Sequence, residues 1–310
     1  MIKKDIYNGQ LKEQLKASAR DRLHRFMLAD GMVRGAIVRT TRMVNEMRAN
    51  HGLGGLETLV LGQAYIAAAL LTANLKARDR VSLTVQCSGP IKGFDVESNV
   101  FGEVRGYLKA PGFSSHVSPE TSTLSSLFGA GFLTVTKYLE EAKQPYSGQV
   151  VLEYGTLAED LANYFLTSEQ TPTAFSLSVH FDEAGEVTGA GGLFLQAMPG
   201  ADDRKVAEAQ AMLKKIDSLG QSFADNQEPD TLVSRHFKEL NPRLLEGHRV
   251  EFFCRCSEKK MNDHLALLPR QDIVDILDNG PFPVELRCHN CNSVYHFTRQ
   301  DIEKLHNNRK

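Results

Sequence analysis

The sequence predicts an α+β fold, because strand-like and helix-like segments mix along the first two thirds of the chain without strict alternation. Apolar and polar residues alternate at 81–87 and 175–179, which is typical of half-buried strands. Residues 56–75 are rich in Ala and Leu and indicate a buried helix. With 42% hydrophobic and 24% charged residues among 310, the chain can form a sizeable core.

Residues 1–200 are expected to form an α+β core domain. Within it, Thr156-Leu-Ala-Glu159 is a capping box and predicts a helix that runs to about Ser168. Asp182-Glu-Ala-Gly185 predicts a hairpin turn before the strand-like residues 186–197. Pro199-Gly200 then interrupts the pattern and marks the end of this domain.

Residues 201–247 predict an amphipathic helical linker. Asp202 can cap a first helix whose apolar residues recur at spacings of three and four: Val206, Ala209, Met212, Leu213, Ile216 and Leu219. Pro229 begins a second helix that ends before Pro242, after a polar loop at 224–228. Two such helices lack a core of their own, so their apolar stripe is expected to pack on the core domain.

Residues 248–310 predict a small C-terminal domain of short elements, which contains four of the five cysteines. Its expected elements are helices at 261–268 and 271–277, strands at 284–287 and 294–297, and a last helix capped by Thr298. The four cysteines form two close pairs, Cys254-x-Cys256 and Cys288-x-x-Cys291.

Two pairs of thiolates suit one tetrahedral zinc ion. On extended backbone, Cys254 and Cys256 project to the same side, and the second pair has the spacing of a zinc knuckle. The sequence therefore predicts that Cys254, Cys256, Cys288 and Cys291 bind one Zn²⁺ in the reduced protein.

A structural zinc that only folds the domain is the commoner role of such a site, but the C-x-C pair favours a regulatory one. A disulfide within so short a ring is strained and easily reduced. Zinc bridges the 31-residue loop from Ser257 to Arg287, whereas disulfides within the pairs leave that loop open. A domain of about 60 residues has little core to compensate for losing the metal. Oxidation is therefore expected to unfold it.

Charge and hydropathy indicate the compartment. The N-terminal stretch MIKKDIYNGQLKEQLK lacks an apolar secretory signal. The longest apolar run, Ala64–Leu71, is shorter than the roughly 20 residues of a membrane span. The formal net charge of −2 favours neither nucleic acid nor an anionic membrane. The protein is expected to be cytoplasmic, where cysteines more often bind metals or react with oxidants than form structural disulfides.

The chain resembles the 33-kilodalton chaperonin family, the redox-regulated holdase chaperones of bacteria. The resemblance includes the two cysteine pairs with a loop of about thirty residues between them, and it extends along essentially the whole chain. It is carried by the stretches MVRGAIVRTT, GPIKGFDVESNVFGEVRGYL, PYSGQVVLEYGTLAEDLANYFLTSEQTPTAF and FFCRCSEKK. The linker, residues 201–247, matches by helical character more than by motif.

This resemblance implies a chaperone without enzymatic activity that is zinc-bound and inactive when reduced. Oxidants of the peroxide or hypochlorite kind, with unfolding conditions, would form the disulfides Cys254–Cys256 and Cys288–Cys291 and release zinc. The C-terminal domain and the linker would then unfold and hold unfolding client proteins without ATP in a response to stress. The active form would be a homodimer.

The main alternative is a zinc-ribbon module, with structural zinc, in a protein that binds nucleic acid or another protein. From His248 onward there are ten Lys and Arg against nine Asp and Glu. Four thiolates with Zn²⁺ add about −2, which is a poor basis for binding phosphates. A zinc enzyme is a third interpretation, but four cysteines leave zinc no open position, and the sequence contains neither H-x-E nor G-x-S-x-G.

Several further residues are expected to have structural roles. Cys87 is interpreted as a buried, inert thiol, and Glu159 and Asp160 as part of a cap and a solvated helix face. Glycines are expected to form a turn at 52–55 and to mark a bulge at 189–192. Three histidines near the site are not expected to be ligands: His264, His289 and His296.

Overall fold

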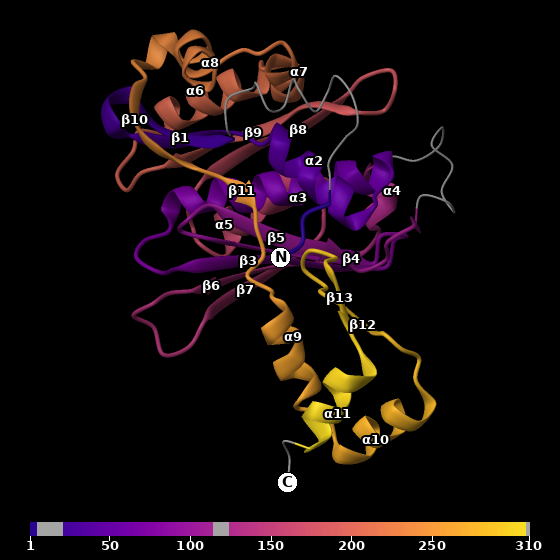
Figure 1. Ribbon diagram of the computed structural model, residues 1–310. Coiled ribbons are helices and arrows are strands. Elements are labelled where there is room, and N and C mark those ends of the chain that lie inside the picture. The colour runs from indigo at the N-terminus through magenta and orange to yellow at the C-terminus, as the bar shows by residue number, and fades with distance from the viewer. Residues whose placement is uncertain (5–20, 114–123, 308–310) are drawn as a thin grey trace.

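The computed structural model describes residues 1–4, 21–113 and 124–307. Most of the charged N-terminal stretch considered for a signal, and the last three residues of the C-terminal segment, lie outside these ranges. Helices and strands mix throughout the described chain, so the predicted α+β class is confirmed. Figure 1 shows a layered body with a small C-terminal module that projects away from it.

Two largely antiparallel sheets form the body. The first sheet has the order β10-β1-β2-β9-β8. Its strands are β1 (Arg22–Leu28), β2 (Val33–Arg39), β8 (Thr173–Phe181), β9 (Val187–Ala197) and β10 (Arg243–Arg249). The second sheet has the order β11-β5-β4-β3-β6-β7, and β11 joins it in parallel. Its strands are β3 (Arg80–Cys87), β4 (Gly93–Asn99), β5 (Glu103–Leu108), β6 (Gly131–Tyr138), β7 (Tyr146–Val151) and β11 (Glu251–Phe252).

Helices fill the space between the two sheets. These are α2 (Thr41–His51), α3 (Gly55–Leu71) and α5 (Leu157–Thr167). The predicted buried helix is α3, which contacts β4 and β5 of one sheet and β8 and β9 of the other. Short elements complete the body: η1 (Ala29–Gly31), η2 (Thr72–Asn74) and α4 (Leu124–Phe128).

The stretch Gly55–Asn74 is long and apolar enough to cross a membrane by length and composition. However, 78% of its most apolar window is buried inside the protein. The segment is therefore the central helix of the fold, and its burial between the sheets explains its composition.

Three helices, rather than the expected two, cover the outer face of the first sheet (Figure 1). They are α6 (Asp203–Lys214), α7 (Leu219–Ala224) and α8 (Pro229–His236), followed by η4 (Lys238–Leu240). The predicted first helix is interrupted after Lys214, and Ser218 caps a new one by accepting the Gln221 N–H at 3.1 Å. A capping serine competes with a continuous helix for the same backbone groups.

The apolar stripe of these helices packs as expected on the sheet. Phe223 and Phe237 are fully buried in one cluster with Phe26 and Ile37 of the sheet. This contact depends on the glycines of β9, because a Cβ on Gly191 would lie 2.2 Å from the Phe223 ring. The bulge predicted at 189–192 is misplaced: these residues pair with β8 in regular register, and the register shifts just before them, between the pairs His180–Gly189 and Phe181–Val187.

The strand β10 was not predicted. Its side chains are mostly exposed and show no alternation, but its backbone pairs with β1 at the edge of the first sheet. The expected boundary between residues 247 and 248 falls within this strand. The chain therefore leaves the linker helices as β10 and enters the second sheet as β11, so both sheets anchor the connection.

The C-terminal module contains the elements that its sequence predicts. They are α9 (Glu258–Leu265), α10 (Arg270–Asn279), β12 (Val284–Arg287), β13 (Val294–Phe297) and α11 (Arg299–Asn307). The helix α9 begins three residues before its predicted start because the Ser257 hydroxyl caps it, accepting the Lys260 N–H at 3.3 Å. The helix α10 ends at Gly280, as the sequence predicts.

Candidate metal centre

The first cysteine pair lies on extended chain that continues from β11. The backbone beyond β11 follows β5, and the Phe253 N–H donates to the Val104 carbonyl at 3.0 Å. Cys254 and Cys256 come next and are both buried. Because residues two apart on extended backbone face the same way, both sulfurs point toward the module.

The second pair lies in the tight loop between β12 and β13. The Cys288 N–H donates to the Ser293 carbonyl at 2.9 Å, and the Asn292 N–H donates to the Cys288 carbonyl at 2.7 Å. Asn292 has a φ of +54°, a left-handed conformation that asparagine tolerates better than most residues. The loop buries Cys288 and Cys291 and turns both sulfurs toward the first pair.

The four sulfur atoms lie within 4.8 Å of one another. Cys254 Sγ is 3.8 Å from Cys288 Sγ, and Cys256 Sγ is 3.4 Å from Cys291 Sγ. All five cysteines of the chain lie within the described ranges and are free thiols. A zinc tetrahedron with Zn–S bonds of about 2.3 Å has sulfur–sulfur edges of about 3.8 Å. The four sulfurs therefore lie close to the positions that a tetrahedral zinc ion requires, and small side-chain shifts would complete the fit.

Without a nearby cation, the pKa values of the thiols prevent all four from being ionised together. Hydrogen bonds from Cys288 and Cys291 hold the pKa of Cys254 far below its usual range. The same contacts raise the pKa of Cys288 to about 11, through its hydrogen bond to Cys254, and raise that of Cys291 much further. Four adjacent thiolates thus require a compensating positive charge, which a metal ion provides.

Three polar side chains that the sequence did not single out surround the sulfurs. The Tyr295 hydroxyl is 3.2 Å from Cys256 Sγ, and the Ser293 hydroxyl is 3.2 Å from Cys291 Sγ. Arg105 of β5 donates to Cys254 Sγ at 3.7 Å. Such contacts orient metal ligands and adjust their charge. Ser293 and Tyr295 could have been suspected from their position just after Cys291, whereas Arg105 comes from a distant strand.

The nearby histidines are not part of the sulfur cluster. His289 packs its ring edgewise against Tyr107, with the ring centroids 5.2 Å apart. His296 Nδ1 is 3.6 Å from Glu285. The group of possible ligand atoms found in the described chain contains the four cysteines and no histidine. His264 lines a hollow together with Cys254, Cys256 and Cys288.

Other expected roles are partly confirmed, with two corrections. Cys87 is only half-buried against the core and not buried as predicted, and this partial burial raises the pKa of its thiol. Gly52 ends α2 with a φ of +69°, as a turn residue does. Glu159 completes the cap, because its N–H donates to the Thr156 hydroxyl. The expectation for Asp160 is wrong: it is 1% exposed and accepts the backbone N–H of Glu153 and Tyr154.

Comparison with known proteins gives one consistent result. The family model described as Hsp33 protein matches residues 21–298. The 33 kDa chaperonin of Desulforamulus reducens is 35% identical over 286 residues, which cover 92% of this chain and 97% of that protein. That of Ruminiclostridium cellulolyticum is 32% identical over 287 residues, with the same shares. The crystal structure of the 33 kDa chaperonin (heat shock protein 33 homolog) from Thermotoga maritima superimposes with a TM-score of 0.84 at 32% identity, covering 94% of this chain and 99% of that one.

Proposed function

The chain belongs to the Hsp33 protein family of chaperones, and from that premise we propose that it is an ATP-independent holdase activated by oxidation. In the reduced state Cys254, Cys256, Cys288 and Cys291 bind one Zn²⁺. The residues from about 248 onward then stay folded against the core domain, and the chaperone is inactive. The observation that supports this most strongly is the buried cluster of four sulfurs, which joins two chain segments more than thirty residues apart.

When bound, Zn²⁺ supplies a crosslink between the β11 extension and the β12–β13 loop and compensates the charge of the thiolates. The module has few other means of staying closed. Besides the cysteines it buries only six hydrophobic side chains among the residues described from 257 to 307: Leu265, Ile273, Tyr295, Phe297, Ile302 and Leu305. So small a core rarely supports a fold without a metal or a disulfide.

Oxidation consumes one hydroperoxide for each disulfide. Two thiols lose two electrons and their two protons, an S–S bond forms, and the O–O bond of hydrogen peroxide breaks to give two molecules of water. Two equivalents therefore convert the four thiols into Cys254–Cys256 and Cys288–Cys291. Once the sulfurs are oxidised, they are no longer thiolate ligands, and zinc is released.

The pairing of the disulfides decides the outcome. All four sulfurs are close enough to react, and Cys256 lies 3.4 Å from Cys291 of the other pair. A bond between the pairs would keep the crosslink that the metal provided. Bonds within the pairs remove it, since each closes only a local ring. We therefore expect intra-pair bonds in the active protein.

The surface for client proteins lies under the linker. The helices of residues 201–247 cover an apolar face of the first sheet, and both partners contribute to one buried cluster. Unfolding of the linker would uncover apolar side chains on both: Phe223, Phe237 and Leu240 on the linker, and Phe26, Ile37 and Leu195 on the sheet. Exposed apolar patches of this kind bind unfolded chains. As in the family, we expect the active form to be a cytoplasmic homodimer.

A single experiment tests this function. The zinc-loaded, reduced protein is treated with hydrogen peroxide at mildly elevated temperature. Zinc release, disulfide pairing by peptide mass spectrometry, and suppression of aggregation of a chemically unfolded test protein are followed together. We expect all three to rise in parallel, with Cys87→Ser behaving as the unchanged protein. Zinc release without anti-aggregation activity would contradict the chaperone switch, and a dominant Cys256–Cys291 bond would contradict the pairing.

A further inference from the structure

One face of α2 carries a polar stripe that the proposed switch does not use. Arg42, Glu46 and Asn50 follow one another at intervals of four residues and therefore lie on the same side of the helix. Glu46 is 4% exposed and Asn50 is 1% exposed. Buried polar side chains of this kind are almost always hydrogen-bonded. The partners of this stripe connect the core to the four-cysteine site.

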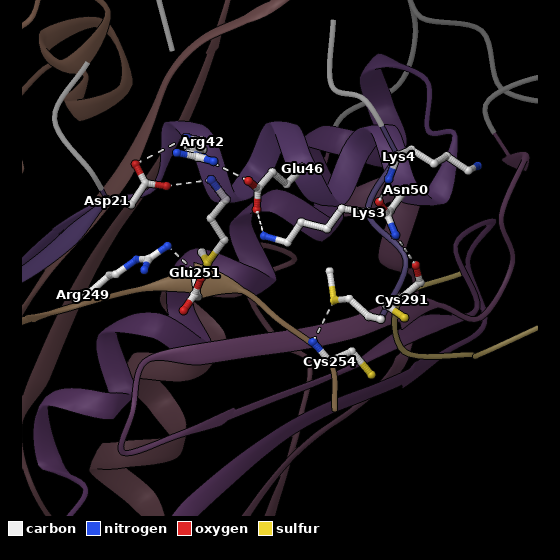
Figure 2. Close-up of polar contacts among 12 residues, drawn as sticks. Lys3, Lys4, Asp21, Arg42, Glu46, Asn50, Arg249, Glu251, Cys254 and Cys291 are labelled. Carbon is white, nitrogen blue, oxygen red and sulfur yellow. Dashed lines mark hydrogen bonds and ion pairs between the residues drawn. The ribbon is translucent and has the colours of Figure 1, made fainter. Parts of the chain in front are cut away.

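The first four residues of the chain lie along this stripe, as Figure 2 shows for Lys3 and Lys4. Lys3 Nζ is 2.5 Å from a Glu46 carboxylate oxygen, whose other oxygen is 3.0 Å from Arg42 Nε. The Lys4 backbone N–H donates to Asn50 Oδ1 at 2.8 Å. The first residues of the chain are thus fixed to α2 by an ion pair and by a backbone hydrogen bond.

Asn50 also binds the second cysteine pair. Its side-chain Nδ2 donates to the Cys291 carbonyl at 2.8 Å and to the Ile2 carbonyl at 3.1 Å. Its own carbonyl accepts a hydrogen bond from Asn292 Nδ2 at 2.9 Å. A single buried side chain therefore joins α2, the N-terminal residues and the loop that carries Cys291.

The first two residues touch both cysteine pairs. The Cys254 N–H donates to the Met1 sulfur at 2.9 Å, and the Met1 nitrogen donates to the Cys256 carbonyl at 2.9 Å. The Ile2 N–H donates to the Ser293 hydroxyl at 3.0 Å, and that hydroxyl donates back to the Ile2 carbonyl at 2.9 Å. These contacts span the metal centre from one pair to the other.

We propose that residues 1–4 and Asn50 form a latch, with Asn50 as its positioning residue, that holds both cysteine pairs on the core domain. The inference rests on the proposed function and extends it to the core side of the switch. Every latch contact to the module is made to the backbone or side chain of residues 254–256 and 291–293. A change in the conformation of either pair therefore breaks latch contacts, and release of the module from the core accompanies loss of the four-sulfur arrangement.

The latch requires a side-chain amide at position 50. Asn50 must donate to two carbonyls and accept from one N–H, which only a side-chain amide of this length does. An aspartate keeps the acceptor for Lys4 but places carboxylate oxygens against the Cys291 and Ile2 carbonyls. Removal of the side chain should therefore disturb the site less than this replacement by a near-isosteric acid.

Asn45 provides a matched control on the same helix. It is fully buried, and its Nδ2 donates to the Thr41 carbonyl at 3.0 Å and to the Val187 carbonyl at 2.9 Å, inside the core domain. Asn45→Ala and Asn50→Ala thus each remove a buried amide that donates to two carbonyls. The two carbonyls that lose a donor in Asn45→Ala belong to the core domain, whereas Asn50→Ala removes the hydrogen bond to Cys291 of the cysteine module.

The test measures zinc transfer from the full-length, reduced protein to a chelating indicator, with hydrogen exchange of residues 288–297 as a second readout. Loss of one to two net hydrogen bonds should accelerate zinc transfer about tenfold in Asn50→Ala, and more in Asn50→Asp. Asn45→Ala should lower the midpoint of global unfolding and leave the transfer rate unchanged. If Asn50→Ala does not fold, Lys3→Ala, at an exposed position, should still accelerate transfer about twofold.

Equal transfer rates in Asn50→Ala and Asn45→Ala, or an Asn50→Asp rate no higher than that of Asn50→Ala, would overturn the latch. These outcomes are separate from failure of the proposed function. If the unchanged protein gained no anti-aggregation activity on oxidation, the chaperone switch would fail, while the difference between the two asparagines in hydrogen exchange would still decide the latch.

Discussion

The linker helices and the four-cysteine module are held to the core domain by different forces. The linker buries ten hydrophobic side chains, including the fully buried Phe223 and Phe237, in a cluster shared with the first sheet. The module buries six hydrophobic side chains besides its cysteines. Its contacts with the rest of the protein include hydrogen bonds around the sulfur atoms, donated by Ile2, Asn50 and Arg105.

This difference predicts that, in the proposed switch, the module responds to oxidation before the linker does. The linker is held by hydrophobic packing, which oxidants do not weaken directly. The module depends on thiolates and therefore responds directly. The linker helices and the module lie at opposite ends of the body and are joined along the chain by β10 and β11 (Figure 1). Release of the module should therefore act on the linker by loosening this connection, and heat should complete the change. Under the proposed function, the module is the sensor of oxidants and the linker is the effector that binds clients.

The largest expected effect is the loss of one metal ligand. Structural zinc contributes on the order of 10 kcal/mol of apparent folding free energy, so Cys291→Ser should unfold the module. By hydrogen exchange, residues 258–307 should lose protection, whereas α6 to α8 should keep theirs at low temperature. Cys87→Ser, which removes a thiol outside the cluster, should change neither region. Equal loss of protection in linker and module would erase the distinction between them.

Truncation of a buried linker side chain should weaken the linker and leave the module unchanged. Phe223→Ala removes a fully buried ring and should cost about 4 kcal/mol of linker stability. The oxidised variant should suppress aggregation at a lower temperature than the unchanged protein, because its linker detaches more easily. Zinc affinity in the reduced state should not change. Leu267→Ala, at a position 81% exposed, is the control with no expected effect.

The junction between the two regions should depend on pH. Asp21 accepts the Met43 N–H at 2.6 Å, and its carbonyl accepts the Val250 N–H between β10 and β11. Burial raises the pKa of its carboxyl group from 3.8 to about 7. Between these values the folded protein binds a proton that the unfolded chain does not, so stability falls as pH rises through this window and is constant above it.

The size of this effect is about 2 kcal/mol between pH 5 and pH 7, at about 1.4 kcal/mol per pH unit when a full proton is linked. Urea unfolding midpoints of the zinc-loaded, reduced protein should show it. Asp21→Asn cannot titrate and should flatten this part of the profile. A profile in the variant as steep as in the unchanged protein would assign the dependence to another group.

The smallest effects come from two matched helix caps. Ser257 caps α9 of the module, and Ser218 caps α7 of the linker. Replacing either with alanine should cost about 1 kcal/mol. Ser257→Ala should accelerate zinc transfer to a chelator, and Ser218→Ala should instead lower the temperature at which the oxidised protein becomes active. If Ser257→Ala and Ser218→Ala both changed zinc transfer, or both changed the activation temperature, the module and the linker would not be independent in stability.

The sequence predicts the metal-binding chemistry of the cysteines better than it predicts how the module is attached to the core domain. The spacing of the cysteines is a local property, and the capping and turn residues around it, such as Thr298 and Gly280, specify nearby backbone geometry. The element bounds at β12 and β13 were therefore predicted closely. The strand β10 could not be, because its stability comes from pairing with β1 more than two hundred residues away and not from its own pattern.

The missed site residues have the same explanation. Arg105, Asn50 and the N-terminal residues meet the cysteines only through the tertiary fold. One signal was available, because Arg42, Glu46 and Asn50 place polar side chains at every fourth position of a largely buried helix. Asp160 was misread for a related reason: a carboxylate in the first turn of a helix can satisfy the backbone of the preceding loop instead of facing solvent.

In the proposed switch, metal coordination by the four thiolates keeps the module closed, and a disulfide within either cysteine pair cannot replace it. Hydrogen exchange of the protein after peroxide oxidation at low temperature, with zinc and disulfides quantified in the same sample, tests it most directly. We predict that residues 258–307 lose protection in proportion to zinc released while α6 to α8 remain protected until the temperature is raised. A module that stays protected after zinc has left and both intra-pair bonds have formed would contradict this account.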